Sequence, residues 1–195
     1  PDGSTVKLNS GSEVTYAYNP QKKVREVRFQ GEGYFDVSKS KRPFVVKMAN
    51  GVEVKVLGTT FNLKAYPDDP TIRASLIEGH IELEHQNDRL VMKAGEMAEF
   101  DKRTNRLKQV EGDLSHSYGW LKNKLYMDDM SLANVCKYLE RWYNVDITVQ
   151  GDLGEQIHYN GVIQEDTIVE VMEALSKLSN IVYHVKGKHI SITSK

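Results

Sequence analysis

Residues 52–65 read VEVKVLGTTFNLKA, and apolar side chains alternate with polar ones in both halves of this stretch. In the first half, Val52, Val54 and Val56 share one face. In the second half, the apolar positions are 61, 63 and 65. A period of two residues is typical of a β-strand with one buried face and one solvent-exposed face. The stretch therefore predicts two half-buried strands in a β-rich part of the chain.

The same period recurs on both sides of this stretch, up to about residue 115. Turn-forming Gly, Asn, Asp and Pro residues separate the other candidate strands, which are residues 14–18, 27–29, 34–37, 44–48, 72–76, 81–84 and 97–100. No segment of this half has a convincing helical period. Many short strands with regular turns predict a sandwich or a barrel. We expect a mainly β N-terminal domain, a jelly-roll-like β-sandwich, over residues 1–112.

In the second half, helical patterns alternate with strand patterns. Apolar residues recur at helical spacing in 132–143 and again in 168–178, where Thr167 and Glu170 stand at the spacing of a capping box. A strand-like segment precedes and follows each helix, and the two units align without a gap at an offset of 36 residues. This pattern predicts a small α+β domain made of a duplicated βαβ unit, with two helices on one small sheet. We expect this domain at 123–195, after a linker at 113–122.

The chain ends in a predicted β-hairpin. If Lys186 and Gly187 form its two-residue loop, His184 pairs with His189 on one face. Tyr183 then pairs with Ile190 on the other face. That apolar face comprises Ile181, Tyr183, Ile190 and Ile192. Two histidines across a hairpin fall short of the three or four ligands that zinc sites use, so they are interpreted as exposed polar residues and no metal site is predicted.

Composition narrows the classes of function. The chain has 195 residues, with 26 Lys and Arg against 27 Asp and Glu, and a formal net charge of -1. A protein that binds duplex nucleic acid needs a sustained basic excess to neutralise phosphates, so nucleic acid is not an expected partner. No run of 18 apolar residues is present, and the sequence therefore holds no candidate membrane span. The single cysteine cannot form an internal disulfide.

No set of residues has the spacing of a catalytic or cofactor site. Cys136 falls on the apolar stripe of the first helix, where a free cysteine acts as a small buried hydrophobe. Glu82 and Glu84 alternate with apolar residues, as solvent-facing strand residues do. Gly31-Glu32-Gly33 lacks the Lys-Ser/Thr pair of a phosphate-binding loop. We therefore expect no enzymatic activity, no catalytic residues and no cofactor.

Tyrosines in the β half leave one alternative open. Sugar-binding β-sandwiches use exposed aromatic side chains in a groove, and Tyr16, Tyr18, Tyr34 and Tyr66 all lie in this half. Tyr16 and Tyr18 share a face with Val14, which favours packing in the core. A carbohydrate-binding β-sandwich module is kept as the alternative function.

Linked motifs in the first half closely resemble the FecR family. The resemblance covers about residues 1–110. FecR proteins are transmembrane regulators, anti-sigma factors of TonB-linked surface signalling. The motifs that carry the resemblance are PDGS at 1–4, LNSGS at 8–12, GEGYFDV at 31–37, RPFVV at 42–46, VKVLGTTFNL at 54–63, LIEG at 76–79 and AGE at 94–96.

The second half resembles the C-terminal domain that follows FecR in Bacteroidetes members. In that family the domain is similar to the signalling domain of TonB-dependent transducers and to secretin N-domains. Family members begin with a cytoplasmic sigma-binding segment and one transmembrane helix, and these 195 residues contain neither. The resemblance implies the periplasmic part of a regulator anchored to the inner membrane. It rests on Trp120, Ser131-Leu132, Leu139-Glu140-Arg141, Tyr143-Asn144-Val145 and Tyr159-Asn160-Gly161.

The resemblance implies signal transmission in the periplasm. Its partner would be the N-terminal signalling domain of a TonB-dependent outer-membrane receptor, and an ECF sigma factor would be controlled only through the segments that this chain lacks. We hypothesise docking on the strands that open the two repeats, since an open sheet edge accepts a partner strand. A homotypic assembly domain is a further alternative. The candidate partner-binding residues are Leu125, Tyr126, Met127, Tyr159, Gly161 and Val162.

Overall fold

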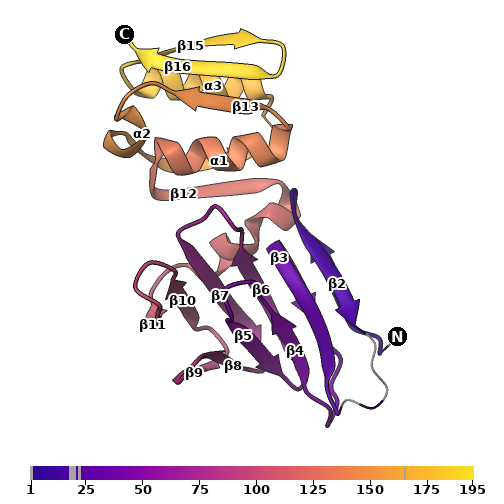
Figure 1. The fold of residues 1–195 in the computed structure, drawn as a ribbon. Helices are drawn as coiled ribbons and strands as arrows, with labels where there is room; N and C mark the ends of the chain where they lie inside the picture. Colours follow the sequence, from indigo (N-terminus) through magenta and orange to yellow (C-terminus); the bar gives the residue numbers. More distant parts are fainter. Residues whose placement is uncertain (1, 18–20, 22, 165) are drawn as a thin grey trace. The chain divides into compact units, whose positions relative to one another are not determined.

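The computed structural model describes residues 2–17, 21, 23–164 and 166–195 (Figure 1). The chain divides into two compact units, Pro1–Tyr118 and Gly119–Lys195, each with its own hydrophobic core. The first unit is built of strands, and the second combines helices with strands. The predicted order, a mainly β part followed by a small α+β part, is confirmed.

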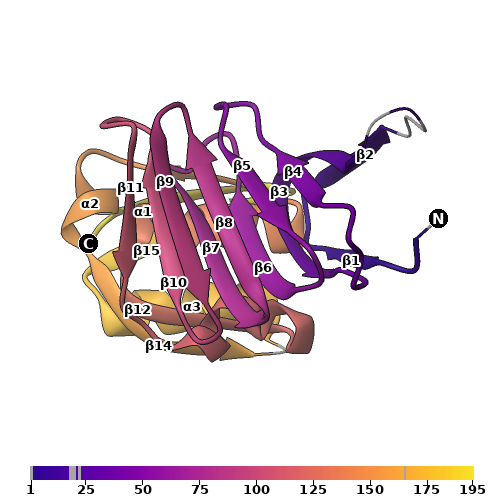
Figure 2. The same ribbon diagram turned by 90° about the horizontal axis from the view of Figure 1, so that it is seen from below.

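One continuous sheet contains the strands of the first unit. Its order is β11-β10-β7-β6-β3-β4-β5-β8-β9, with β1 and β2 also paired to β3. The ends of this order come together, because the backbone N–H of Leu107 in β11 donates to Asp88 Oδ2 in β9 over 3.2 Å, and Figure 2 shows β11 beside β9. The sheet is a near-barrel, and the finer description as a jelly-roll-like sandwich stays a prediction. The strands are β1 (Thr5–Leu8), β2 (Glu13–Ala17), β3 (Arg25–Asp36), β4 (Phe44–Lys47), β5 (Glu53–Val56), β6 (Thr60–Ala65), β7 (Thr71–Glu78), β8 (His80–His85), β9 (Asp88–Lys93), β10 (Met97–Asp101) and β11 (Arg106–Val110).

Alternating burial along these strands builds the first core. In β5, Val54 and Val56 are buried while the intervening side chains are partly exposed, as the period of two predicts. Phe61 in β6 is fully buried and stacks on Phe35 in β3, with ring centroids 4.9 Å apart. Stacked and interdigitated apolar side chains of this kind supply most of the free energy that holds the sheet closed.

Strand β3 corrects one prediction. The segments 27–29 and 34–37 were expected as separate strands, but they belong to one strand of 12 residues. Gly31 has a φ of +102° within it, and a Cβ at this position would lie 2.3 Å from Ser12 Oγ. Glycine therefore bends the strand without ending it. The first half of β3 pairs with β2 and β4, and the second half pairs with β1 and β6.

The second unit contains the predicted helices. Ser131 caps α1 by accepting a hydrogen bond from the N–H of Asn134 (3.4 Å), and Thr167 and Glu170 form the predicted capping box at the start of α3. No helix within the described ranges is long and apolar enough to cross a membrane. The elements are the 3-10 segment η1 (Leu114–Lys122), which begins in the first unit, then β12 (Lys124–Ser131), α1 (Leu132–Tyr143), β13 (Asp146–Val149), α2 (Leu153–Gln156), β14 (His158–Gln164), α3 (Ile168–Leu178), β15 (Ile181–Lys186) and β16 (His189–Ser194).

The strands of the second unit form two sheets, so the prediction of one small sheet is wrong. β12 pairs antiparallel with β14, while β13, β16 and β15 form a separate sheet in that order. A strand–helix–strand order does occur twice, as β12-α1-β13 and β14-α3-β15. The period of a strand shows which residues lie on one face, but it does not specify the neighbouring strand. The description as a duplicated βαβ unit stays a prediction.

The terminal hairpin has a different register from the predicted one. Lys186 pairs with His189 and Tyr183 pairs with Ile192, so the loop is Gly187-Lys188. Gly187 has a φ of +63°, and a glycine at the first loop position suits a type II′ turn. The shift of two residues keeps every side chain on its predicted face. His184 lies opposite Ser191, and the expected pairing of the two histidines is therefore wrong.

Candidate functional site

The six predicted partner-binding residues lie in one two-stranded sheet. Leu125, Tyr126 and Met127 are in β12, and the other three are in β14. The register places Tyr126 opposite Val162 and Met127 opposite Gly161. The strands that open the two units of the sequence pattern therefore pair with each other. Within the described ranges, neither strand has a second strand neighbour.

Burial divides these residues into two groups. Leu125, Met127 and Tyr159 are buried and belong to the core of the second unit. Tyr126 is half-buried, and Val162 is 50% exposed. Because side chains alternate across a strand, Tyr126 and Val162 share the outer face of the sheet. A docking partner would meet the side chains of these two residues, but only the backbone of the three core residues.

Tyr126 is covered in part by the connecting segment. A Cβ at Gly119 would lie 2.6 Å from the Tyr126 ring, so the backbone of Gly119 passes directly over the ring. Only glycine permits so close an approach. The outer face of β12 is therefore more protected than that of β14.

A bulge shapes the middle of the β12–β14 sheet. The register shifts between Met127 and Met130, and Asp129 in this bulge has a φ of +48°. The backbone N–H of Asp129 donates to Asn160 Oδ1 over 2.9 Å. Bulges bend a strand and redirect its side chains. The Asn160 side chain thus fixes the conformation of the bulge from the opposite strand.

Strand β14 is also tied to helix α3. Tyr159 Oη lies 2.6 Å from Ser179 Oγ, and Ser179 Oγ donates to the carbonyl oxygen of Leu175 over 2.7 Å. Burial raises the pKa of Tyr159, which keeps its hydroxyl protonated. The side chains exposed along β14 are those of His158, Asn160, Val162 and Gln164. The strand therefore combines a rigidly held inner face with a solvent-exposed outer face.

Reactive and metal-binding chemistry is not evident around this sheet. Burial raises the pKa of the Cys136 thiol to about 12, so the thiol stays protonated at neutral pH. Among the described residues, no group of three or more His, Cys, Asp and Glu side chains could hold a metal ion. In the other sheet of this unit, His189 Nδ1 lies 3.3 Å from Asp146 Oδ2, an exposed contact of two residues and not a ligand set. What the sheet offers is backbone and side-chain surface for binding.

The described tyrosines that were considered for sugar binding lie in different environments. Tyr66 is buried, and its hydroxyl donates to the carbonyl oxygen of Ser10 over 2.7 Å. Tyr34 packs edge-to-face on Tyr118, with ring centroids 6.1 Å apart. Tyr16 is 39% exposed, and Tyr18 lies outside the described residues. Of the described tyrosines in this set, Tyr66 lies in the core and Tyr34 packs on another ring, which disfavours the carbohydrate-binding alternative.

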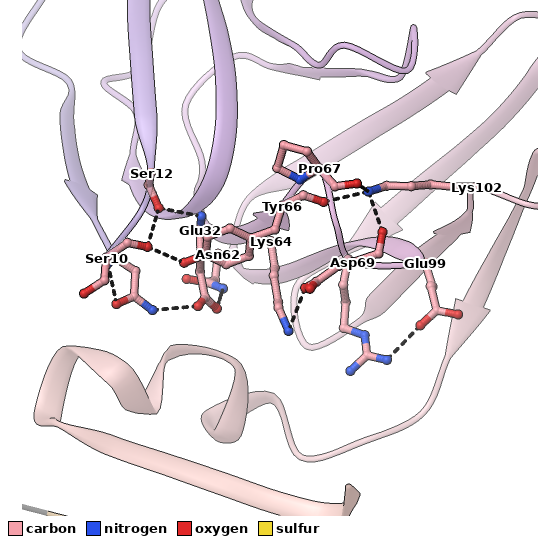
Figure 3. Close-up of polar contacts among 12 residues, drawn as sticks. Ser10, Ser12, Glu32, Asn62, Lys64, Tyr66, Pro67, Asp69, Glu99 and Lys102 are labelled. Carbon is pink, nitrogen blue, oxygen red and sulfur yellow. Dashed lines mark hydrogen bonds and ion pairs between the residues drawn. The ribbon is translucent and has the colours of Figure 1, made fainter. Parts of the chain in front are cut away.

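Sequence reasoning missed a buried polar cluster around Glu32 in the first unit (Figure 3). Glu32 is 3% exposed, and its carboxylate accepts hydrogen bonds from Asn9 Nδ2 (2.8 Å) and Asn62 Nδ2 (3.2 Å). Burial raises the pKa of Glu32 against the opposing effects of Lys64 and the two amides. The signal in the sequence was a carboxylate between two glycines, Gly31 and Gly33, a segment interpreted as a family motif and tested as a phosphate loop, but not as a buried charge.

A buried arginine at the start of β3 was also missed. Arg25 is 6% exposed, and its Nη1 lies 2.6 Å from Asp2 Oδ2 and 3.0 Å from the carbonyl oxygen of Ser38. Its Nε donates to the carbonyl oxygen of Arg42, and its guanidinium lies 5.4 Å from the ring centroid of Phe44. Strand residues with this charge are normally exposed. No pattern in the sequence distinguished the buried Arg25 from the exposed charged residues of other strands.

A lysine ammonium holds the loop that follows β6. Lys102 Nζ donates to the carbonyl oxygens of Tyr66 (2.6 Å), Pro67 (3.2 Å) and Asp69 (2.6 Å), as Figure 3 shows. Lys64 Nζ lies 3.1 Å from Asp69 Oδ2. Three converging carbonyl oxygens would suit a cation, and here the ammonium supplies that positive charge. This loop is therefore a structural feature of the first unit.

Comparison with known protein families finds a matching family model in each of the two units. The family model for FecR protein matches residues 1–82, and the model for the FecR C-terminal domain matches residues 124–192. The chain belongs to the FecR family. The FecR match contains Arg25 and Glu32, and the FecR C-terminal match contains all six predicted partner-binding residues.

Solved structures of similar proteins agree with this FecR assignment. Crystal structures at 1.65 Å and 2.50 Å resolution of a candidate anti-sigma factor from Parabacteroides distasonis ATCC 8503 match with a TM-score of 0.90 in each case. The two sequences are 26% identical, and the match covers 100% of this FecR-family chain and 92% of the other. No curated protein matches the sequence.

Proposed function

We propose that this FecR-family chain is the sensor and signal-transmitting part of a membrane-anchored anti-sigma regulator. The observation that carries the proposal is the presence of both FecR domains in one chain whose fold matches a candidate anti-sigma factor over its full length. The chain acts in the periplasm, and its signal comes from the N-terminal domain of a TonB-dependent outer-membrane receptor. It controls an ECF sigma factor through membrane and cytoplasmic segments outside these 195 residues. Its role is regulatory and not enzymatic.

The receptor contact is proposed at the β12–β14 sheet. In the part of the chain that the structure describes, β12 and β14 each have only one strand neighbour, and an extended segment of a partner can add to the other edge of such a strand. Of the two strands, β14 is the more accessible docking site for the receptor. Gly119 lies against the Tyr126 ring on β12, while Val162 on β14 is half exposed. The bulge held by Asn160 gives this edge a defined shape.

The six candidate residues have three kinds of role in this proposal. Val162 and Tyr126 contribute apolar side-chain surface on the outer face. Gly161 lies opposite Met127, and its exposed backbone is open to approach by a partner strand. Leu125, Met127 and Tyr159 hold the strands in place from the core. The division into domains at 1–112 and 123–195, with a linker at 113–122, is part of the same proposal.

The test is binding of the purified chain to the N-terminal domain of the cognate receptor, measured by titration calorimetry. Val162→Lys places a charge on the outer face and is expected to weaken binding about tenfold or more, as for a central interface residue. Val91→Lys is the matched control, because Val91 is an exposed strand valine in the first unit (57% exposed). Equal affinity of the Val162→Lys variant and wild type would reject the β14 site. Failure of the wild-type chain to bind would reject the receptor as partner.

A further inference from the structure

The first strand of the chain pairs with β3 along its whole length and has side-chain contacts to β3 just beyond each end. β1 has only four residues, which pair with β3 from Thr5 opposite Asp36 to Leu8 opposite Gly33. Three of its four side chains are exposed, and Val6 alone packs against the core. A short edge strand with so little buried apolar surface opens more easily than the rest of a sheet. The polar contacts at its ends therefore decide whether it stays in place.

The N-terminal end of this segment is held by Arg25. Asp2 Oδ2 accepts from Arg25 Nη1 over 2.6 Å, and Asp2 also accepts from the N–H and hydroxyl of Ser4. Ser4 Oγ in turn accepts from the N–H of Ser38 over 3.0 Å. Buried Arg25 Nη2 has no hydrogen-bond partner among the described residues, so the Asp2 carboxylate supplies an important part of the stabilisation of this buried positive charge.

The C-terminal end of the segment is held by Glu32. Asn9 Nδ2 donates to Glu32 Oε2 over 2.8 Å, and the N–H of Asn9 donates to the carbonyl oxygen of Glu32 over 2.9 Å. Just beyond, Ser12 Oγ accepts from the N–H of Glu32 over 2.8 Å. Figure 3 shows the serines of this turn beside Glu32. Both ends of the segment thus attach to β3, one at a buried cation and the other at a buried carboxylate.

Each buried charge also has partners that do not belong to the segment. Arg25 keeps the carbonyl oxygens of Ser38 and Arg42 and the ring of Phe44. Glu32 keeps Asn62 Nδ2, which comes from β6. Loss of residues 2–9 would therefore leave both charges partly compensated inside an intact sheet. The barrel does not have to unfold when the segment leaves.

We propose that residues 2–9 form a detachable strap, which opens from β3 as one unit with Arg25 and Glu32 as its two anchoring points. This inference rests on the proposed function: release of the strap is the step that passes a change in the sensor to the chain that precedes it in the regulator. When the strap opens, the edge of β3 from Gly33 to Asp36 loses its β1 partner. The other strands of the near-barrel keep their pairing.

Hydrogen exchange of the whole chain tests whether the strap opens independently. The amides of β1 are expected to exchange faster than those of β6 in wild type. Asp2→Asn and Asn9→Ala each remove one end contact and are expected to accelerate β1 exchange about 10- to 100-fold, the range for loss of a charge-assisted hydrogen bond. Glu111→Gln, at an exposed position, is the control and leaves both rates unchanged. If the amides of β1 exchange at the same rate as those of β6, in wild type and in both variants, the strap proposal is wrong.

A covalent lock tests the role of opening. Thr5 and Asp36 are exposed and lie directly opposite each other, so Thr5→Cys with Asp36→Cys can be joined by a disulfide or a short bismaleimide. Cys136 is buried and does not compete. In the full-length regulator, the locked pair is expected to retain receptor binding and to lose at least about tenfold of the sigma-dependent reporter response, while either single cysteine variant responds normally. A normal response of the locked regulator would overturn the strap and leave receptor binding, and with it the proposed function, intact.

Discussion

The hydroxyl groups of Tyr159 and Ser179 lie 2.6 Å apart and join the start of β14 to the C-terminal end of α3. Ser179 Oγ also reaches the carbonyl oxygen of Leu175, which is in the last turn of that helix. The candidate receptor-binding strand is therefore supported by a helix through a chain of hydrogen bonds in the core. Such networks hold a surface strand in one position more strictly than apolar packing does alone.

Replacing Tyr159 by Phe is expected to lower the free energy of unfolding of the second unit by about 1 kcal/mol, the usual loss for one buried hydrogen bond. Urea unfolding followed by far-UV circular dichroism measures this change. Tyr183→Phe is the matched control, since Tyr183 is a partly buried strand tyrosine in the same unit. A difference below about 0.3 kcal/mol between the two variants would contradict a structural role for the hydrogen bond.

Glu32 is expected to make the first unit less stable as the pH rises. Its pKa in the folded chain is raised above the ordinary value of 4.5, chiefly by burial. The folded state therefore holds this proton more tightly than the unfolded state, so its favourable contribution is present below pH 4.5 and is lost as the pH rises through the folded pKa. Glu32→Gln cannot titrate. In urea titrations, the free energy of unfolding of wild type minus that of the variant should fall as the pH rises above the ordinary pKa of 4.5. A constant difference would argue against a raised pKa.

Asp2 is expected to have the opposite dependence on pH. Burial opposes its ionisation, but hydrogen bonds from Ser4 and Arg25 outweigh burial and lower the Asp2 pKa from 3.8 to about 2. Its contribution to stability is therefore complete above pH 3.8 and is lost as the pH falls through about 2. Asp2→Asn should cost about 1–2 kcal/mol at neutral pH, a value discounted for partial exposure. When the free energy of unfolding of both proteins is measured at decreasing pH, the values for wild type and Asp2→Asn should converge at low pH. A difference that stays constant with pH would contradict the ion pair.

Gly31→Ala is expected to destabilise the first unit strongly. Gly31 combines a φ of +102° with a Cβ position 2.3 Å from Ser12 Oγ, so alanine adds both backbone strain and a collision. Gly95 has a φ of +92° with nothing within 4 Å of its Cβ position, and Gly95→Ala therefore measures the strain alone. Thermal unfolding should give a loss of about 1 kcal/mol for Gly95→Ala and at least about 2 kcal/mol more for Gly31→Ala. Equal losses would show that the turn at Ser12 moves away freely.

Much of the secondary structure follows from the spacing of apolar residues. The valines of β5 and the Phe61–Leu63 pattern of β6 have their buried faces where the period of two places them. The capping box of Thr167 and Glu170 begins α3 as predicted, because those contacts lie within one turn of chain. Local contacts of this kind depend only on nearby residues. They can therefore be inferred from the sequence alone.

Strand partners and buried charges depended on the tertiary structure. The pairing of β12 with β14, and of β13 with β16, joins segments that no local pattern connects. The same holds for Arg25 and Glu32, whose charged side chains are buried where Asp2, Asn9 and Asn62 reach them from other segments of the chain. The sequence alone determined many of the strands, the two longer helices, their apolar faces and the resemblance to the FecR family, but it missed strands β1, β9 and β11. Only the tertiary structure decided which strands are neighbours and which charges are buried, because those outcomes depend on contacts between residues far apart in the chain.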